Sequence, residues 1–205
     1  MAEREHGASL SAAVDGIVLA AGRGERIGRP KAELELGGQT FLEHALAALL
    51  GGGCRSVVVV VADQREVLVT GPADDVVYVR NPDPDSEQVD SLRIGLKALP
   101  VDTAAAMVLP VDVPAVRPET VAALIQAFDR EDCVIVRPVH DGRPGHPTLF
   151  ARPLFPELCT PGLPRGAESI VELHAAGTRD VVVDDAGVLL DVDTPADLRR
   201  LVEGA

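Results

Sequence analysis

Short apolar runs alternate with segments of helical periodicity along this chain of 205 residues. The runs from Val14 to Leu19 and from Ser56 to Val61 are almost purely apolar, which is typical of strands buried on both faces. Between the strands, apolar residues recur every three or four positions and predict amphipathic helices. Further strands are predicted at 76–79, 104–109, 134–136, 148–150 and 181–183. Helices are predicted at 41–50, 89–99, 118–128, 166–175 and 195–202.

Three of these helices begin with a recognisable local signal. Thr40, with Glu43 three positions later, matches a capping box. Pro118 suits the first turn of a helix, because its missing N–H is not needed there. Thr194 precedes the last helix and is a suitable N-cap.

The order of strands and helices predicts an α/β fold of three layers, α/β/α, around a mostly parallel, Rossmann-like sheet. Residues 1–13 are expected to form a flexible leader, and residues 14–205 a single domain. In such sheets the ligand binds outside the carboxyl ends of the strands. The segments that follow the strands at 14–19 and 104–109 are therefore expected to face one another across one site.

The segment after the first strand concentrates glycine and positive charge. Gly22, Gly24 and Gly28 let the backbone bend sharply and approach a ligand closely. Successive backbone N–H groups in such a turn can form an anion-binding concavity. The cations of this segment are Arg23, Arg26, Arg29 and Lys31, in a protein of formal net charge -13. A phosphate-rich ligand explains them best. The alternatives are a turn without a ligand and a solvated face, and we favour the solvated face for Arg29.

The spacing of this segment excludes two familiar phosphate-binding loops. A dinucleotide fingerprint requires G-x-G-x-x-G, whereas here three residues separate Gly24 from Gly28. A P-loop requires a serine or threonine after its lysine, and Ala32 follows Lys31.

Two groups of aspartates follow predicted strands. Asp112 lies between Pro110 and Pro114, and a carboxylate at this edge can hold Mg²⁺ beside substrate phosphates. A helix cap or a turn is the alternative for Asp112. Asp191 and Asp193 alternate along an extended segment, so they share a face and either could be the second metal ligand. Capping of the last helix by Asp193 or Thr194 is compatible with that role.

Polar residues elsewhere are weaker candidates. Asn81 and Ser91 can hydrogen-bond a base or ribose, and Ser91 can equally serve to start its helix. His146 lies in a turn and is either structural or an acceptor contact. A nucleophilic role for Cys54 would need a partner that the sequence does not provide.

Composition excludes several classes of protein. The acidic balance argues against nucleic-acid binding, because such a protein must neutralise phosphates along a strand. No apolar run approaches the roughly 18 residues of a membrane span. The first eleven residues are polar and do not resemble a signal peptide. Three widely spaced cysteines suggest free thiols in a reducing cytoplasm.

Several motifs, taken in order, resemble a known family. Leu19-Ala20-Ala21-Gly22-x-Gly24-x-Arg26-x-Gly28-x-Pro30-Lys31 is similar to the signature of GT-A-like nucleotidyltransferases, and most similar to the molybdenum-cofactor nucleotidyltransferase group. The other matching motifs are Ser91-Leu92-x-x-Gly95-Leu96, Asp112-x-Pro114, Gly145-His146-Pro147-x-Leu149-Phe150 and Asp191-x-Asp193-Thr194-Pro195. The resemblance covers almost the whole chain from Gly16 on. Leu-Ala-Ala-Gly and the Gly-His-Pro turn are similar to the cytidylyl branch.

The resemblance implies a Mg²⁺-dependent transfer of a nucleoside monophosphate, CMP from CTP, to a phosphorylated acceptor with release of pyrophosphate. Lys31 and Arg26 would stabilise the leaving pyrophosphate, while Asp112 and Asp193 would hold the metal. His146 and Arg165 would contact the acceptor, for which molybdopterin is the first choice. The expected nucleotide-binding residues are Leu19, Ala20, Ala21, Gly22, Arg23, Gly24, Asn81 and Ser91. A protein that receives the product is a further expected partner.

Two departures from the cytidylyl branch concern the acceptor. Glu87 stands four residues before Ser91, where that branch usually has glycine. Leu163-Pro164-Arg165-Gly166-Ala167-Glu168 stands where it usually has Gly-Asp-x-Gly-Ala-Arg. A sugar phosphate, an alcohol phosphate or an acceptor with its own cationic group is therefore an alternative. Two alternatives belong to other classes. The loop spacing argues against a Rossmann-type oxidoreductase, and the aspartates argue against a non-catalytic nucleotide-binding regulatory domain.

Overall fold

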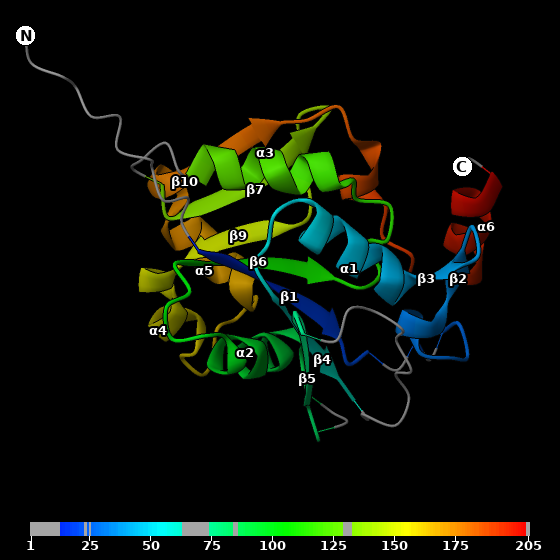
Figure 1. The fold of residues 1–205 in the computed structure, drawn as a ribbon, viewed down its shortest axis with the longest axis horizontal. Coiled ribbons are helices and arrows are strands. Elements are labelled where there is room, and N and C mark those ends of the chain that lie inside the picture. Colours follow the sequence, from blue (N-terminus) through cyan, green and yellow to red (C-terminus); the bar gives the residue numbers. More distant parts are fainter. Residues whose placement is uncertain are drawn as a thin grey trace, which may run out of the picture.

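The computed structural model describes residues 13–22, 24, 26–62, 74–83, 86–128 and 133–203. A central sheet crosses the molecule, with helices on both of its faces (Figure 1). Its strands lie in the order β10-β7-β9-β6-β1-β4-β5, and β8 pairs with β7. They are β1 (Val14–Ala20), β4 (Val57–Val61), β5 (Val76–Arg80), β6 (Ala105–Pro110), β7 (Ile135–His140), β8 (Arg143–Pro144), β9 (Thr148–Ala151) and β10 (Thr178–Val182). The leader expected at residues 1–13 lies, except for Ala13, outside the described residues.

The sheet is mostly parallel, as the sequence predicts. β1 pairs in parallel with β4 and β6, β4 with β5, and β7 with β10. The sequence does not reveal that β9 runs antiparallel between β6 and β7. Strand direction depends on partners distant in the chain, so a short apolar run such as 148–150 does not specify it.

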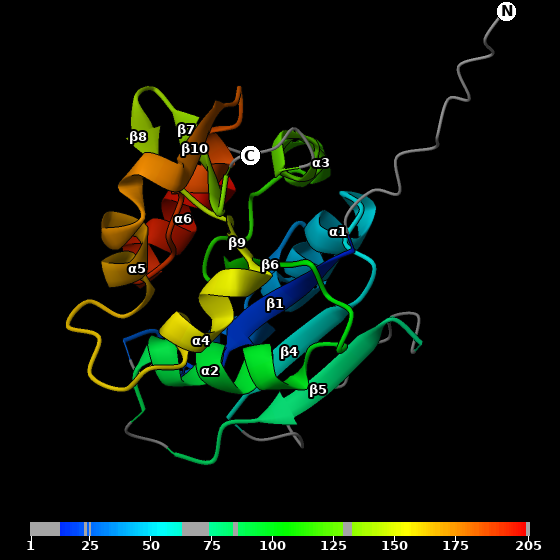
Figure 2. The same cartoon turned by 90° about the vertical axis from the view of Figure 1, so that its left-hand side faces the viewer.

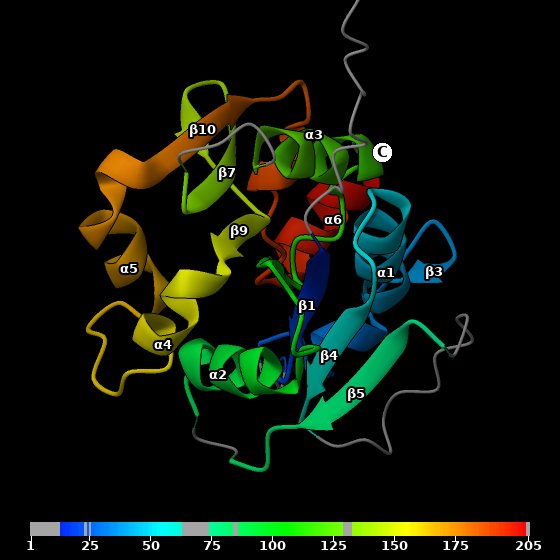
Figure 3. The same cartoon turned by 60° about the vertical axis from the view of Figure 1, so that its left-hand side comes forward.

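Helices form the two outer layers, which Figures 2 and 3 show from the side of the sheet. α1 (Phe41–Gly51) and α3 (Pro118–Phe128) pack on one face, against the side chains of Val18, Val59 and Met107. On the opposite face lie α2 (Gln88–Ala98), α4 (Phe155–Leu158) and α5 (Ala167–Leu173), which pack against alternate residues of the same strands. The last helix, α6 (Pro195–Glu203), lies beside the hairpin of β2 (Glu35–Leu36) and β3 (Gln39–Thr40) in Figure 1. The three-layer prediction is confirmed.

The capping box predicted at the start of α1 is present in the structure. The Thr40 side chain accepts a hydrogen bond from the Glu43 backbone N–H at 3.1 Å, and the Glu43 carboxylate accepts one from the Thr40 N–H at 2.6 Å. This capping box satisfies two N–H groups that a helix start leaves unpaired. The structure adds the β2–β3 hairpin and the single-turn helix α4, which the sequence analysis missed because both are too short to show a period.

An ion pair between the buried Asp15 and the exposed Arg55 lies near the amino ends of β1 and β4. Asp15 is fully buried in β1, and Arg55 donates to both of its carboxylate oxygens at 3.1 and 2.8 Å. Ser56 and Thr103 donate to the same carboxylate. Burial alone would raise the pKa of Asp15, but these hydrogen bonds outweigh it and lower the pKa. The network lies at the opposite end of the strands from the glycine-rich segment, so its role is structural.

Candidate functional site

The carboxyl ends of β1 and β6 lie side by side and bring the two main sequence features together. Leu19 pairs with Pro110 in the sheet, and the N–H of Val111 donates to the Leu19 carbonyl at 3.1 Å. The glycine-rich segment leaves β1 immediately after this point, and Asp112 follows β6. The expectation that these two segments face one another is confirmed.

Gly24 organises the part of the glycine-rich segment that the structure describes. Its carbonyl accepts hydrogen bonds from the N–H groups of Ile27 and Gly28, at 2.9 and 2.8 Å. Its φ is +61°, and a Cβ placed there would lie 1.9 Å from the Arg29 carbonyl oxygen. A glycine is therefore required at this position for a steric reason. Arg23 lies outside the described residues, and the side chain of Arg26 is exposed.

Lys31 connects the amino-terminal and carboxyl-terminal parts of the site. Its Nζ lies 2.8 Å from Asp112 Oδ2 and 2.6 Å from Asp193 Oδ1. Only 15% of the Lys31 side chain is exposed to solvent. Burial opposes the charged form, yet the hydrogen bonds to the two carboxylates outweigh it and raise the pKa of Lys31. The lysine is therefore charged and bridges the two aspartates that the sequence predicts as metal ligands.

The segment from Asp191 to Thr194 is fixed against the end of β6. The N–H of Val192 donates to the Asp112 carbonyl at 2.9 Å, and the Val192 side chain is buried between two exposed aspartates. Thr194 caps α6, because its hydroxyl oxygen accepts from the Asp197 N–H at 3.2 Å and its own N–H donates to the Asp197 carboxylate. The carboxylate of Asp193 is thus directed to Lys31 and not to the cap.

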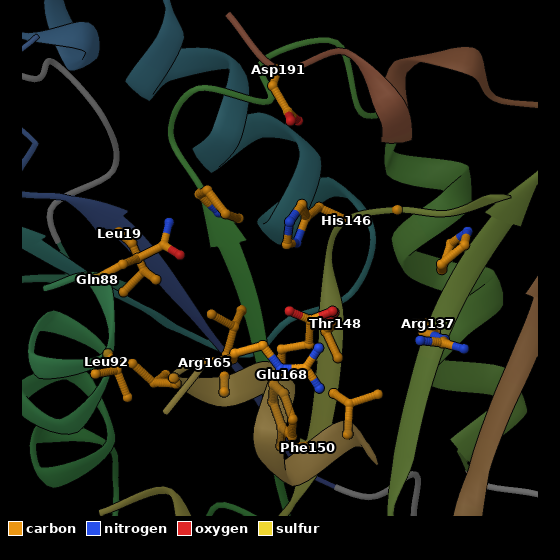
Figure 4. Close-up of a pocket in the computed structure, with 18 of the residues that line it drawn as sticks. Leu19, Gln88, Leu92, Arg137, His146, Thr148, Phe150, Arg165, Glu168 and Asp191 are labelled. Atoms are coloured by element: carbon orange, nitrogen blue, oxygen red, sulfur yellow. The ribbon is translucent and has the colours of Figure 1, made fainter. Parts of the chain in front are cut away.

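Asp191 and His146 form the neighbouring part of the site (Figure 4). Partial desolvation of its carboxylate, followed by the negative charge of Asp112, raises the pKa of Asp191. Burial lowers the pKa of His146 and outweighs the opposite effect of Asp191 and Asp112. A neutral imidazole is therefore expected near pH 7. The backbone N–H of His146 donates to the Val188 carbonyl at 2.9 Å, while the ring Nδ1 is buried with no hydrogen-bond partner in the described part of the chain.

A cavity of about 580 Å³ opens next to this pair of side chains. Figure 4 shows Asp191 and His146 toward one end of it, and Arg165 and Glu168 toward the other. Its walls come from the ends of β1 and β6, from β7 and β9, and from the first turns of α2 and α5. The apolar lining residues include Leu19, Leu92, Val108, Phe150 and Val171. The cavity is thus large enough for a small organic molecule with an apolar part.

Opposite charges are mixed around this cavity. Of the three arginines that line it, Arg137 pairs with Asp180 at 2.6 Å and Arg165 pairs with Glu172. The third is Arg143, and the lining carboxylates are Glu87, Glu168 and Asp191. Arg165 and His146, which the sequence predicts as acceptor contacts, therefore share one cavity with the two glutamates that depart from the family pattern. Arg137 and Thr148 also line the cavity, and strand alternation in the sequence does not mark either residue as functional.

Asn81 and Ser91 are brought together, although not in an open site. Both are buried, and Asn81 Nδ2 donates to Ser91 Oγ at 2.9 Å and to Ser86 Oγ at 2.8 Å. The Asn81 amide oxygen accepts the N–H of Asp83. These bonds join the end of β5 to the start of α2, so the pair shapes the loop, and a direct contact with a base stays a prediction.

The Cys54 thiol is not placed to act as a nucleophile. Cys54 is 5% exposed, and burial raises the pKa of its thiol to about 12. A thiol needs its deprotonated form to react. Cys54 therefore packs as a small apolar residue.

The chemistry of the aspartates fits a hard divalent cation. In the described residues no group of three histidine, cysteine or acidic side chains is gathered closely enough to form a complete metal site. Asp112 and Asp193 nevertheless place one carboxylate oxygen each within 2.8 Å of a single cationic atom. Mg²⁺ is commonly bound by one or two carboxylates together with substrate phosphates and water. The pair of aspartates suffices for that mode of binding.

Comparison with known proteins defines the class of this chain as a nucleotidyltransferase. The family model of the MobA-like NTP transferase domain matches residues 16–181. The chain belongs to this family. None of the helices in the described part of the chain has both the length and the apolar character that a membrane crossing needs.

Relatives of known sequence differ in the nucleotide and acceptor that their names state. The chain is 32% identical over 194 residues to 2-C-methyl-D-erythritol 4-phosphate cytidylyltransferase of Streptomyces coelicolor, covering 84% of this chain and 72% of that protein. It is 29% identical over 202 residues to the probable molybdenum cofactor guanylyltransferase of Mycobacterium marinum, covering 97% and 96%. Among solved structures, Rv0371c of Mycobacterium tuberculosis superposes with a TM-score of 0.82 at 27% identity, covering 94% of this chain and 99% of that one. Rv0371c has also been crystallised in complex with manganese.

Proposed function

We propose that this protein transfers CMP from CTP to a phosphorylated small molecule in a Mg²⁺-dependent reaction that releases pyrophosphate. A phosphate oxygen of the acceptor forms a bond to the α-phosphorus. The bond between the α-phosphorus and the bridging oxygen breaks, and its electron pair leaves with pyrophosphate. The observation that carries the proposal is the contact of Lys31 with Asp112 and Asp193 at the carboxyl ends of the strands, beside a cavity large enough for the acceptor.

The residues of this chain would mainly position the reactants and neutralise charge. The glycine-rich segment would bind the triphosphate through backbone N–H groups, and Lys31 and Arg26 would stabilise the leaving pyrophosphate. Asp112 and Asp193 would hold Mg²⁺, with Asp191 as the alternative second ligand. When bound, the ion would supply positive charge for the phosphate oxygens. Positioning of this kind accounts for most of the catalysis in phosphoryl transfer.

The preference for CTP rests on the resemblance of Leu19-Ala20-Ala21-Gly22 to the cytidylyl branch. Relatives named as a cytidylyltransferase and as a guanylyltransferase match at similar identity, so they do not decide between the bases. A site built to hydrogen-bond one base rejects another that leaves its polar groups unpaired. Pyrophosphate release should therefore be measured with all four nucleoside triphosphates at matched concentration. CTP is expected to be used best, and equal or better use of GTP would overturn the base assignment.

Molybdopterin is the first acceptor to test, because relatives that match over 97% of this chain are named probable molybdenum cofactor guanylyltransferases. The cavity offers Arg143, His146 and Arg165 for its phosphate and polar groups. Molybdopterin should support pyrophosphate release from CTP and protect the backbone amides around Arg165 from hydrogen exchange. If it does neither while a simple phosphate monoester does both, the molybdenum assignment is wrong and the transferase class stands.

A smaller acceptor, or one with a cationic group, is the second candidate. The observation that favours it is the presence of Glu87 and Glu168 in the cavity, where a carboxylate opposes an anionic ligand. A panel of sugar phosphates, alcohol phosphates and aminoalcohol phosphates separates the two candidates.

The described cysteines are free thiols, which fits action in the cytoplasm. A protein that takes up the product remains part of the proposal for the molybdenum cofactor.

A further inference from the structure

The two aspartates proposed for the metal already hold a cation that belongs to the chain. Lys31 Nζ lies within hydrogen-bond distance of one oxygen from each, at 2.8 Å for Asp112 and 2.6 Å for Asp193. Asp112 lies 81 positions after Lys31 in the sequence, and Asp193 lies 162 positions after it. Their convergence is therefore a product of the tertiary fold and not of a local turn.

We infer that the Lys31 ammonium takes the place of the divalent ion in the metal-free protein, and that metal binding releases it toward the triphosphate. This inference rests on the proposed metal role of Asp112 and Asp193. It goes beyond that role by assigning Lys31 two alternative positions. Lys31 is thus a positioning residue for the metal-free carboxylates and a substrate contact when the metal is bound.

The Lys31 ammonium and a divalent ion compete for the same two carboxylates, because both carry positive charge. Without a cation, the carboxylates of Asp112, Asp191 and Asp193 would repel one another across a partly buried site, and Lys31 offsets part of that repulsion. An ion with two positive charges between Asp112 and Asp193 would repel the ammonium strongly at the same short range. The lysine must then leave the bridging position.

The chain gives Lys31 both the freedom and a destination for this movement. A lysine side chain has a flexible four-carbon stem that carries a compact charge, so it can be redirected without moving the backbone. Its backbone lies at the start of a short 3-10 helix, Lys31–Glu33, directly after Pro30. The proposed triphosphate-binding segment, which includes Gly24 and Gly28, directly precedes it in the chain.

Metal binding and triphosphate binding are coupled, because both depend on where the Lys31 ammonium lies. In the metal-free protein the ammonium is held by carboxylates, so the triphosphate meets a site whose lysine is already engaged. Metal binding frees the lysine and adds charge of its own. Because binding free energies are reciprocal, a bound triphosphate must strengthen metal binding by the same factor.

The sequence provides an unusually simple way to observe the lysine. The chain contains two lysines, Lys31 and Lys97, and Lys97 is exposed on α2. Protein labelled with ¹⁵N and ¹³C in lysine alone therefore gives two side-chain signals, of which Lys97 is an internal control. Titration of the wild-type protein with Mg²⁺, without nucleotide, should shift the Lys31 signal and leave that of Lys97 in place. A Lys31 signal that does not move over a titration to millimolar Mg²⁺ would overturn the inference.

Metal affinity supplies the second readout. Free Mn²⁺ is counted by electron paramagnetic resonance in the absence of nucleotide and acceptor, for wild type, Lys31→Met, Arg29→Ala and Asp112→Asn. Lys31→Met keeps the length of the side chain, removes the competing charge and should bind Mn²⁺ at least about fivefold more tightly, at the lower end of typical coupling. Arg29→Ala removes a charge from the same segment and should stay within about twofold of wild type, while Asp112→Asn should bind more weakly.

Two outcomes of the affinity measurement would contradict the inference. Unchanged or weaker binding by Lys31→Met would show that the lysine does not compete with the ion. Equal tightening by Arg29→Ala would show that only the net charge of the segment matters. Neither experiment requires a nucleotide, an acceptor or turnover, so failure here leaves the proposed transfer to be judged separately by pyrophosphate release.

Discussion

Asp112 and Val192 are joined by a backbone hydrogen bond of 2.9 Å from the Val192 N–H to the Asp112 carbonyl. This bond holds the segment that carries Asp191 and Asp193 against Asp112, two residues after the end of β6. The carboxylates thereby reach the site from a segment that belongs to no strand of the sheet. The positions of Asp191 and Asp193 are thus set by backbone geometry, which a substitution of the Asp112 side chain would leave unchanged.

Lys31→Ala should lower kcat by about 10²–10³, the usual loss when one preorganised electrostatic contact to developing charge is removed. The lysine side chain lies at the edge of the site and makes ion pairs without belonging to the apolar core. Thermal unfolding measured with saturating Mg²⁺, which would then occupy the two carboxylates, should therefore change little. Lys97→Ala is the matched control, because it removes an exposed lysine from α2. Wild-type turnover of Lys31→Ala with a confirmed substrate pair would exclude the catalytic role.

Asp112→Asn should abolish activity, since an amide keeps the size of the side chain but lacks the charge that Mg²⁺ requires. Nucleotide binding in the absence of metal should be largely kept, and calorimetry without metal measures it. Asp191→Asn and Asp193→Asn, compared in the same assay, identify the second ligand. A fully active Asp112→Asn beside an inactive Asp191→Asn or Asp193→Asn would show that the principal ligand has been misassigned.

Gly24→Ala should destabilise the glycine-rich segment and reduce activity, because the new Cβ would lie 1.9 Å from the Arg29 carbonyl oxygen. Gly37 is a matched control, since it has the same φ of +61° and open space around its Cβ position. Gly37→Ala should cost about 1–2 kcal/mol for the left-handed backbone alone. Chemical denaturation of the two variants measures the difference, and equal losses of stability would rule out the steric explanation.

Glu168→Gln should lower the KM for molybdopterin severalfold, because the carboxylate lines the cavity and opposes an anionic acceptor. The KM for CTP should be unchanged. Glu119→Gln, which neutralises an exposed carboxylate at the start of α3, controls for the change in net charge. A rise in KM with the acceptor that proves active would instead indicate a cationic group on that molecule.

The Asp15 network predicts a contribution to stability that is lost in acid. Hydrogen bonds lower the pKa of Asp15 in the folded protein below its ordinary value of 3.8. The unfolded chain therefore takes up the proton first, so the contribution is complete above pH 3.8 and declines as the pH falls below it. Asp15→Asn should be less stable near neutral pH and should show a weaker dependence on pH between about 5 and 2. Urea unfolding across this pH range compares the two proteins.

Signals that are local in the sequence predicted the corresponding structure well. The capping box of Thr40 and Glu43, the valine run of β4 and the proline at the start of α3 each depend on neighbours within a few positions. The parallel core followed from the alternation of strands and helices. The antiparallel insertion of β9 did not, because it depends on pairing with β6 and β7 across the sheet.

In the candidate site, too, local features could be predicted from the sequence and long-range contacts could not. The glycine-rich segment and Asp112 could be placed at one edge, since both follow strands of a parallel sheet. The contact between Lys31 and Asp193 could not be predicted, because it joins residues 162 positions apart through the path of the last segment. Asn81 and Ser91 were identified as a polar pair by type, whereas their mutual hydrogen bond became visible only in the folded chain.

The position of β6 between a parallel and an antiparallel neighbour has a consequence for how this protein can diversify. The elements that precede β6 carry the glycine-rich segment and Lys31, and those that follow it supply Arg137, His146 and Arg165 to the cavity. Most polar side chains of the cavity come from the later stretch, so substitutions there can alter the proposed acceptor site while the glycine-rich segment and Lys31 stay unchanged. Asp112, which follows β6, therefore lies at the junction of the proposed nucleotide site and the proposed acceptor cavity.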